Sequence, residues 1–151
     1  MPPRAPRFPR LALLLGGLAL LACEDLRQFA GVWEGEVSRD PQHQLGFNPG
    51  ARLRATVGSA RRAQLDLALE LPGRSGLYRF EPIQHASDDV LGDVRIAGEP
   101  LRTYFGFVTP ASEPPFLTVV SLFGEDRVEV RLIRGANDIY GVFYLARAAA
   151  P

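Results

Sequence analysis

The sequence predicts an all-β fold, namely a single antiparallel up-and-down barrel of about eight or nine strands preceded by a helical signal peptide. A β-sandwich is the alternative. From about residue 29 onward, apolar and polar side chains alternate with a period of two, as in half-buried strands. Clusters of Gly, Pro, Asn and Asp separate these runs at short intervals and favour hairpin turns. No stretch after residue 29 keeps an apolar stripe at helical spacing for three turns, so the core is expected to consist of strands.

The clearest alternation lies in residues 63–71, where Leu65, Leu67 and Leu69 are separated by polar or small residues such as Asp66. This pattern places the leucines in the core and Asp66 in water. Residues 39–50 are the longest irregular stretch and are expected to lie outside the sheet. The expected strands are residues 31–38, 51–58, 62–71, 76–82, 91–97, 101–109, 116–123, 127–134 and 138–146.

The N-terminus has the pattern of an export signal. Three arginines and no acid occupy the first ten residues, and Leu11–Ala22 follow as twelve residues without a polar side chain. Because a membrane-spanning helix needs about 20 apolar residues, this segment is too short to remain as a transmembrane anchor. It is interpreted as a secretion signal that is removed from the mature protein.

The end of this segment reads Leu20-Leu21-Ala22-Cys23 and resembles the lipobox of bacterial lipoproteins. The resemblance implies that Cys23 is linked to diacylglycerol and becomes the acylated N-terminus. Lipidation also accounts for a single cysteine in an exported chain, which has no partner for an internal disulfide. Ordinary signal cleavage that leaves Cys23 unmodified is the alternative.

The chain is expected to contain one folded domain. The predicted divisions are a lipoprotein signal peptide (1–22), a lipidated tether (23–28), a β-barrel domain (29–147) and a C-terminal tail (148–151). No Pro- or Ser-rich linker divides the barrel region, and its length suits one hydrophobic core. The residues after Cys23 are Glu24 and Asp25, and by the lipoprotein resemblance the expected location is the outer membrane, facing the periplasm.

Composition excludes several classes of function. The chain has 17 basic residues, all of them arginine, so chemistry that needs a lysine is excluded. Removal of residues 1–22 takes away three arginines and no acid, which leaves 14 basic residues against 17 acidic ones. A net charge near −3 does not favour nucleic acid as a partner.

A second resemblance begins in residues 29–35, which read Phe-Ala-Gly-Val-Trp-Glu-Gly. This segment is similar to the Gly-x-Trp that opens the first strand of lipocalins and other calycin barrels, in which the Trp closes one end. The chain lacks the arginine-bearing closing motif and the helix that lipocalins usually have near the C-terminus. An eight-stranded barrel can hold one small ligand, and inward-pointing glycines would leave space for it. The candidate residues for binding a small apolar ligand are Trp33, Gly35, Tyr78, Phe80, Gly106 and Gly141.

The residues offer little support for catalysis or for a metal site. His43 and His85 are 42 positions apart and neither lies in a recognisable motif. The acidic segment from His85 to Asp93 is expected to be a solvated loop rather than a calcium site. We therefore expect no catalytic residue, no metal and no cofactor.

Arginines at positions 52, 54, 61 and 62 form a local basic patch in the sequence. Contact with acidic polysaccharide or lipid phosphate is one interpretation of this patch. The favoured one is that outward-facing charges keep the sheet soluble.

The strands at 116–123 and 139–146 are apolar on both faces, whereas the strand between them alternates. If the outer face is exposed, Tyr140, Val142 and Tyr144 form part of a surface for an envelope protein partner. The alternative is that residues 39–50 or 110–115 cover this face. The favoured function is a non-catalytic structural or interaction lipoprotein, and a small-ligand-binding lipoprotein is the alternative.

Overall fold

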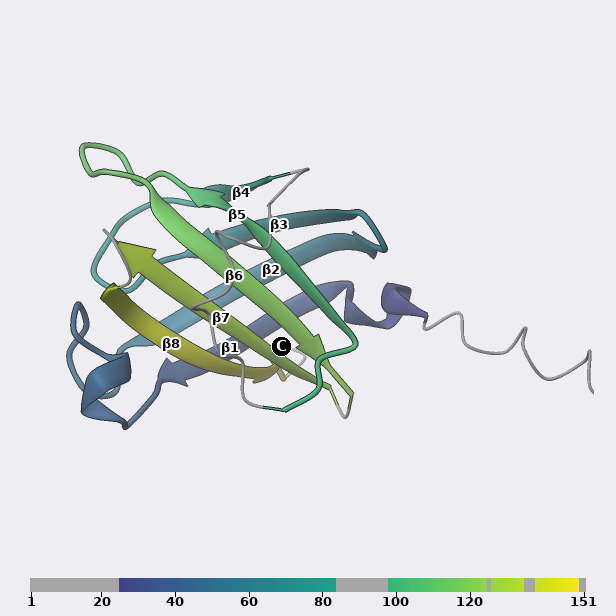
Figure 1. The fold of residues 1–151 in the computed structure, drawn as a ribbon, viewed down its shortest axis with the longest axis horizontal. Helices are drawn as coiled ribbons and strands as arrows, with labels where there is room; N and C mark the ends of the chain where they lie inside the picture. Colours follow the sequence, from purple (N-terminus) through teal and green to yellow (C-terminus); the bar gives the residue numbers. More distant parts are fainter. Residues whose placement is uncertain (1–24, 84–97, 125, 135–137, 150–151) are drawn as a thin grey trace, which may run out of the picture.

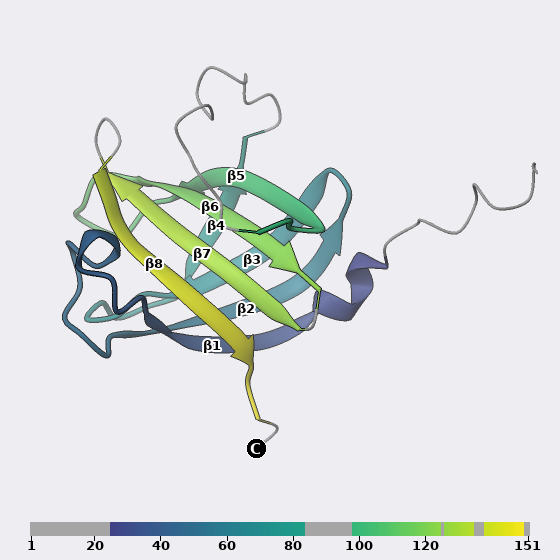
Figure 2. The ribbon, with the colours of Figure 1, turned by 60° about the horizontal axis from the view of Figure 1, so that its bottom comes forward.

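The computed structural model describes residues 25–83, 98–124, 126–134 and 138–149. They form eight antiparallel strands, each paired with the next in the chain, and β8 pairs with β1 to close one barrel (Figures 1 and 2). The strands are β1 (Gly31–Val37), β2 (Arg52–Arg61), β3 (Gln64–Glu70), β4 (Tyr78–Pro82), β5 (Arg102–Val108), β6 (Phe116–Phe123), β7 (Arg127–Arg134) and β8 (Asp138–Arg147). The predicted up-and-down barrel is confirmed, and the sandwich alternative is wrong because a continuous ladder joins all eight strands.

Eight of the nine expected strands occur close to their predicted bounds. The ninth, at 91–97, lies outside the described residues, as do the signal peptide and Cys23. The strand expected to end at residue 58 is longer than predicted, because β2 continues through a bulge there to Arg61. A β-carbon on Gly58 would lie 2.5 Å from a carboxylate oxygen of Asp66 on β3, so glycine lets the strand pass through the bulge.

Two single-turn 3₁₀ helices flank β1. Helix η1 (Leu26–Phe29) precedes it and packs against β2, and η2 (Pro41–His43) follows it and packs against β8. Asp25 and Asp40 cap these turns through their side chains. Among the described residues, no helix has the length and apolar character needed to cross a membrane.

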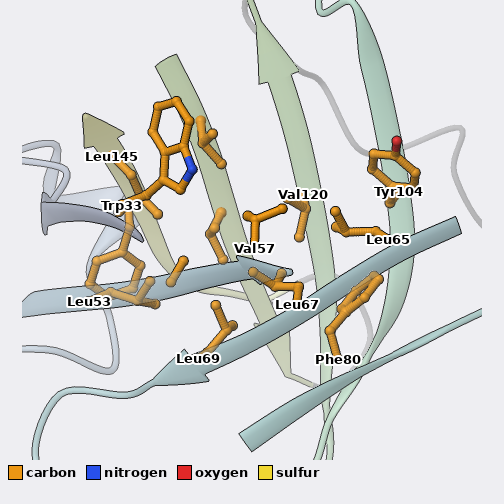
Figure 3. Packing of buried hydrophobic residues seen from close by; sticks show 14 of the residues in the cluster. Trp33, Leu53, Val57, Leu65, Leu67, Leu69, Phe80, Tyr104, Val120 and Leu145 are labelled. Carbon is orange, nitrogen blue, oxygen red and sulfur yellow. The ribbon is translucent and has the colours of Figure 1, made fainter. Parts of the chain in front are cut away.

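Side chains fill the barrel interior. Leu65, Leu67 and Leu69 on β3 point inward and are at most 2% exposed, as their alternation predicts (Figure 3). Trp33 on β1 and Phe80 on β4 point into the same core (Figure 3). Burial of such side chains is the main source of stability for a barrel of this size.

Closure of the barrel depends on a close approach of β1 and β8 at Gly35. This glycine lies opposite Leu53 on β2 and opposite Leu145 on β8. A β-carbon at position 35 would overlap the carbonyl oxygen of Tyr144. Gly35 therefore allows β1 to join two neighbours at once, and it does so by close backbone contact rather than by leaving open space.

Part of the outer face of β6, β7 and β8 is buried. Val119 on β6 and Val142 on β8 point outward and are at most 1% exposed. Between them on β7, Glu129 and Arg131 form an ion pair and are 2% and 4% exposed. Burial of a charge costs several kcal/mol per ion, and the direct contact between Glu129 and Arg131 offsets part of that cost.

The strand register predicts opposite responses at two adjacent positions. Leu67→Asp places an unpaired carboxylate in the core, at an expected cost of several kcal/mol against a total stability of about 5–15 kcal/mol. Asp66→Leu changes an exposed position and leaves the barrel folded. Thermal unfolding followed by circular dichroism measures both variants. Equal melting temperatures would contradict the register.

Candidate functional site

One end of the barrel is closed by Trp33, which lies where β1 begins. Its indole nitrogen donates a 2.9 Å hydrogen bond to the carbonyl of Phe29, and the two rings stack with centroids 5.7 Å apart. The guanidinium of Arg147, at the end of β8, lies 4.5 Å from the centroid of the Trp33 ring. Arg147 also donates to the carbonyl oxygens of Gln28 and Ala30. These contacts fix η1 across this end of the barrel.

An open cavity of about 760 Å³ lies beside η1 at the same end. Its walls come from η1, from the bulge of β2 and the following turn, and from the start of β5. Four of the lining residues are arginines: Arg27, Arg61, Arg62 and Arg102. Three segments that are distant in the sequence thus bring four positive charges to one cavity.

One hydrogen bond joins β5 to the end of β2 beside this cavity. The hydroxyl of Tyr104 on β5 donates to the carbonyl of Arg61, with 2.6 Å between the oxygens. The ring of Tyr104 is buried, and burial raises the pKa of its hydroxyl above the usual 10. The hydroxyl therefore stays protonated and keeps the end of β2 beside the start of β5 at neutral pH.

The charges of this cavity are unbalanced. Asp25 is the only acid among the described residues that line it. Within the described ranges, none of the four lining arginines forms an ion pair. The Nε of Arg102 is buried without a hydrogen-bond partner. An arrangement of unpaired guanidinium groups around a cavity favours an anion with several acceptor oxygens.

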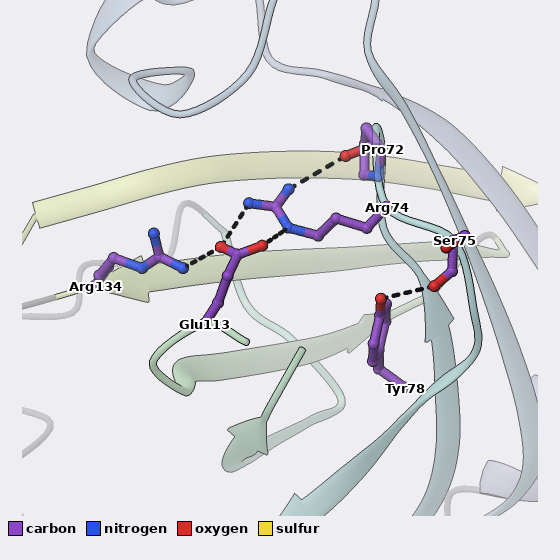
Figure 4. Close-up of polar contacts among 6 residues, drawn as sticks. All are labelled: Pro72, Arg74, Ser75, Tyr78, Glu113 and Arg134. Atoms are coloured by element: carbon purple, nitrogen blue, oxygen red, sulfur yellow. Dashed lines mark hydrogen bonds and ion pairs between the residues drawn. The ribbon is translucent and has the colours of Figure 1, made fainter. Parts of the chain in front are cut away.

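The opposite end of the barrel is sealed by a different arrangement. Glu113, in the β5–β6 loop, accepts hydrogen bonds from Arg74 at 2.5 and 2.9 Å and from Arg134 at 2.7 Å (Figure 4). Both guanidinium groups also lie over the ring of Phe116, at 5.6 and 4.1 Å from its centroid. The two arginines hold the pKa of Glu113 at about 2, well below its usual 4.5.

The predicted ligand-binding residues surround a core that other side chains occupy. A β-carbon on Gly106 would lie 2.5 Å from the ring of Phe80, and one on Gly141 would lie 2.6 Å from the ring of Phe47. The expected space at both glycines is therefore taken by aromatic rings. Tyr78 is half-buried at the edge of the core, and its hydroxyl donates to the carbonyl of Ser75 (Figure 4).

The predicted partner surface on β8 is not a continuous exposed stripe. Val142 is fully buried, Tyr140 is half-buried, and Tyr144 is 43% exposed. Tyr140 packs against Phe47, whose loop lies over the start of β8 through a 2.9 Å hydrogen bond from the Gly46 amide to the Tyr140 carbonyl. Residues 39–50 thus cover Tyr140, as the alternative interpretation expected, and the prediction of an exposed Val142 is wrong.

The basic patch inferred from sequence proximity is divided by the fold. Arg52 and Arg54, at the start of β2, lie within 3.8 Å of Glu34 on β1, and Arg54 also of Glu70 on β3. Arg61, at the other end of β2, is nine residues away, or about 30 Å along an extended strand. Sequence proximity does not connect Arg61 with Arg27 and Arg102, because only the closed barrel brings these positions to one cavity.

The remaining candidates do not form a catalytic or metal arrangement in the described part of the chain. His43 lies 3.7 Å from Asp40, within the single turn of η2. Groups of three or more metal-ligating residues are not found among the described residues. His85 and the acidic residues up to Asp93 lie outside those residues.

The lowered pKa of Glu113 predicts a pH-dependent contribution to stability. Because its folded-state pKa is depressed, the ionised carboxylate stabilises the fold above about pH 4.5, and this contribution disappears as the pH falls toward about 2. Glu113→Gln should therefore lower the urea midpoint at pH 7, and the difference from the parent should shrink between pH 4.5 and 2. The exposed Glu36 is the control, and Glu36→Gln should have little effect. A pH-independent difference for Glu113→Gln would contradict the assignment.

Comparisons with known proteins give no match, so the interpretation of this chain rests on its own fold and sequence. No protein-family model, no curated protein and no solved structure matches it. The closed barrel rests on its strand pairings, and the lipobox and calycin resemblances rest on the residues that carry them.

Proposed function

We propose that this protein is a lipid-anchored lipoprotein of the bacterial cell envelope with a non-catalytic structural or interaction role. Cys23 carries the fatty acyl chains, and the barrel projects from the outer membrane into the periplasm. Two or three acyl chains give stable anchoring, whereas one chain alone is marginal. In this proposal the membrane is reached through the lipid, and a second envelope protein is the partner.

The observation that carries the structural role is the filled and sealed barrel. Its interior holds packed side chains, with Trp33 and the β3 leucines almost without exposure. One end is closed by η1 and Arg147, and the other by Glu113 and its two arginines. A solid barrel is suited to holding an outer surface in a fixed shape.

The end closed by Trp33 supports the proposed relationship to calycin barrels. The Gly-x-Trp segment places Trp33 at the start of β1, and Arg147 lies over the Trp33 ring and donates to carbonyls of the N-terminal turn. A guanidinium over an indole face is a favourable cation–π contact. Membership of that family remains part of the proposal.

The partner surface is proposed to include the exposed ring of Tyr144. This ring is 43% exposed on β8, and tyrosine is enriched at protein interfaces because its ring buries a large area at low entropic cost. Phe107 on β5, 39% exposed, is a second large apolar side chain at the surface. Nucleic acid is not proposed as a partner, because the mature chain is mildly acidic.

A small apolar ligand is the second candidate function, and one observation favours it. Phe47, which occupies the space at Gly141, comes from the loop between β1 and β2 and not from a strand. Its ring packs edge-on against Phe143 with centroids 5.1 Å apart. Withdrawal of this one side chain would open the barrel beside Gly141 without breaking a strand pair.

Substitution of the lipidated cysteine tests the anchoring. Cys23→Ala removes the thiol that forms the thioether, and residues 11–22 are too short to replace a transmembrane anchor. The variant should leave the outer-membrane fraction and either become soluble or keep its signal peptide at the inner membrane. Membrane fractionation and intact-protein mass measure both outcomes. A variant that remains in the outer membrane as firmly as the parent would refute lipid anchoring.

Native mass spectrometry of the protein purified from its own envelope separates the two functions. A filled barrel should show the mass of the acylated chain alone. Retention of a small apolar molecule would instead support the ligand-binding function. In that case Gly141→Phe, whose ring would occupy the space that Phe47 leaves when it withdraws, should abolish retention if the ligand sits there. Trp33 lies at the opposite end and serves as an internal fluorescent reporter that the fold is intact.

A further inference from the structure

We propose that the arginine-lined cavity beside η1 is a membrane-facing surface that binds the phosphate groups of anionic lipid headgroups. This inference rests on the proposed lipid anchor, because the anchor would hold this end of the barrel next to the bilayer. It adds a second contact with the membrane, made by the folded domain itself.

The first argument is the convergence of unpaired positive charge. Arg27 comes from η1, Arg61 and Arg62 come from the β2–β3 hairpin, and Arg102 begins β5. Within the described residues none of them has an ion-pair partner. Asp25 alone among the lining residues carries a negative charge, so the cavity keeps a clear positive excess.

Four arginines toward the opposite end have acidic neighbours instead. Arg74 and Arg134 share Glu113, and Arg52 and Arg54 lie beside Glu34. Each of these four arginines therefore has a carboxylate oxygen within 3.8 Å. The cavity beside η1 thus concentrates unneutralised positive charge on a domain whose total charge is slightly negative.

The second argument is the chemistry of the cavity. Arg102 has a buried Nε that lacks a hydrogen-bond partner, a state that is costly unless a ligand or water satisfies it. Guanidinium groups bind phosphate through two parallel hydrogen bonds, so a phosphate is a well-matched acceptor. The hydroxyl of Ser59 lines the same cavity and can donate another bond. At about 760 Å³ the cavity is large enough to admit a headgroup.

The third argument is the position of the cavity relative to the proposed anchor. Asp25 lines the cavity and is two residues from Cys23, a span of at most about 7 Å for an extended chain. An acylated Cys23 lies at the membrane surface, and charges interact across about 8 Å at physiological ionic strength. The cavity and its arginines therefore lie at the end of the barrel nearest the anchor, whereas Arg52 and Arg54 are nine and seven residues from Arg61, or about 30 and 23 Å along an extended strand.

Vesicle flotation tests this surface independently of lipidation. The full chain carrying Cys23→Ala is mixed with neutral phosphatidylcholine vesicles and with vesicles that also contain about 30% phosphatidylglycerol. All variants share residues 1–22, with their apolar segment and three arginines, so a difference between variants reports the folded domain. We expect tighter binding to the anionic vesicles, and the difference should fall as salt is raised.

Two charge-matched double variants locate the binding surface. Arg61→Gln with Arg62→Gln should weaken binding to anionic vesicles by at least about tenfold, since each basic residue near an anionic surface contributes about fivefold. Arg52→Gln with Arg54→Gln removes the same charge from the other end and should have a much smaller effect. If the first pair does not fold, as judged by thermal unfolding, Arg27→Gln with Arg102→Gln takes its place.

Three results would overturn the proposal. The first is equal binding to neutral and anionic vesicles, and the second is equal weakening by both double variants, which would reflect net charge alone. The third is a rise in melting temperature with inorganic phosphate in a protein that does not bind anionic vesicles, which would indicate a site for a soluble anion. Failure of lipid anchoring is detected separately, by fractionation of the Cys23→Ala variant, because the vesicle assay does not depend on acylation.

Discussion

The structure depends on β1 pairing with two neighbours at once. This strand joins β2 on one side and β8 on the other, and without the second pairing the sheet would have two open edges. Gly35 makes the pairing possible, because any β-carbon there would overlap the backbone of β8. Closure in turn limits the interior to a volume that side chains fill, which is why Trp33 and the inward leucines lie in one continuous core.

Arginine closes both ends of the barrel, through different partners. Arg147 lies over Trp33 and binds carbonyl groups of the N-terminal turn, so it joins the last strand to the residues that precede the first. At the other end, Glu113 joins Arg74 and Arg134 over the ring of Phe116. Arginine suits both roles, because its planar guanidinium group can stack on an aromatic ring while it donates hydrogen bonds at its edge.

The presence or absence of an acid beside each arginine explains why the arginines of this domain have different chemical roles. An arginine that faces an acid across the sheet or at the sealed end has a carboxylate beside it, as Arg54 has Glu34. The arginines beside η1 face a cavity, and Asp25 is the only described acid that lines it. The buried pair of Glu129 and Arg131 on β7 is the opposite extreme, since its charges are removed from water and satisfied by each other. Arg39 and Arg79 are also exposed without an ion pair among the described residues, so the distinguishing feature of the end beside η1 is that four arginines line one cavity.

The sequence by itself determined the strands, their inward faces and the all-β class, because alternation and turn residues are local properties that short segments carry. The resemblance of residues 20–23 to a lipobox and of residues 31–33 to the Gly-x-Trp of calycin barrels is also visible in the sequence. Only the tertiary structure decided that Gly106 and Gly141 face aromatic rings, that Val142 is covered, and that the chain turns after Arg61. The tertiary structure also separates Arg52 and Arg54 from Arg61 and Arg62, and it places Arg61 and Arg102 beside the same cavity. These features depend on which strands become neighbours, and residues 41 positions apart meet only after the sheet has closed into a barrel.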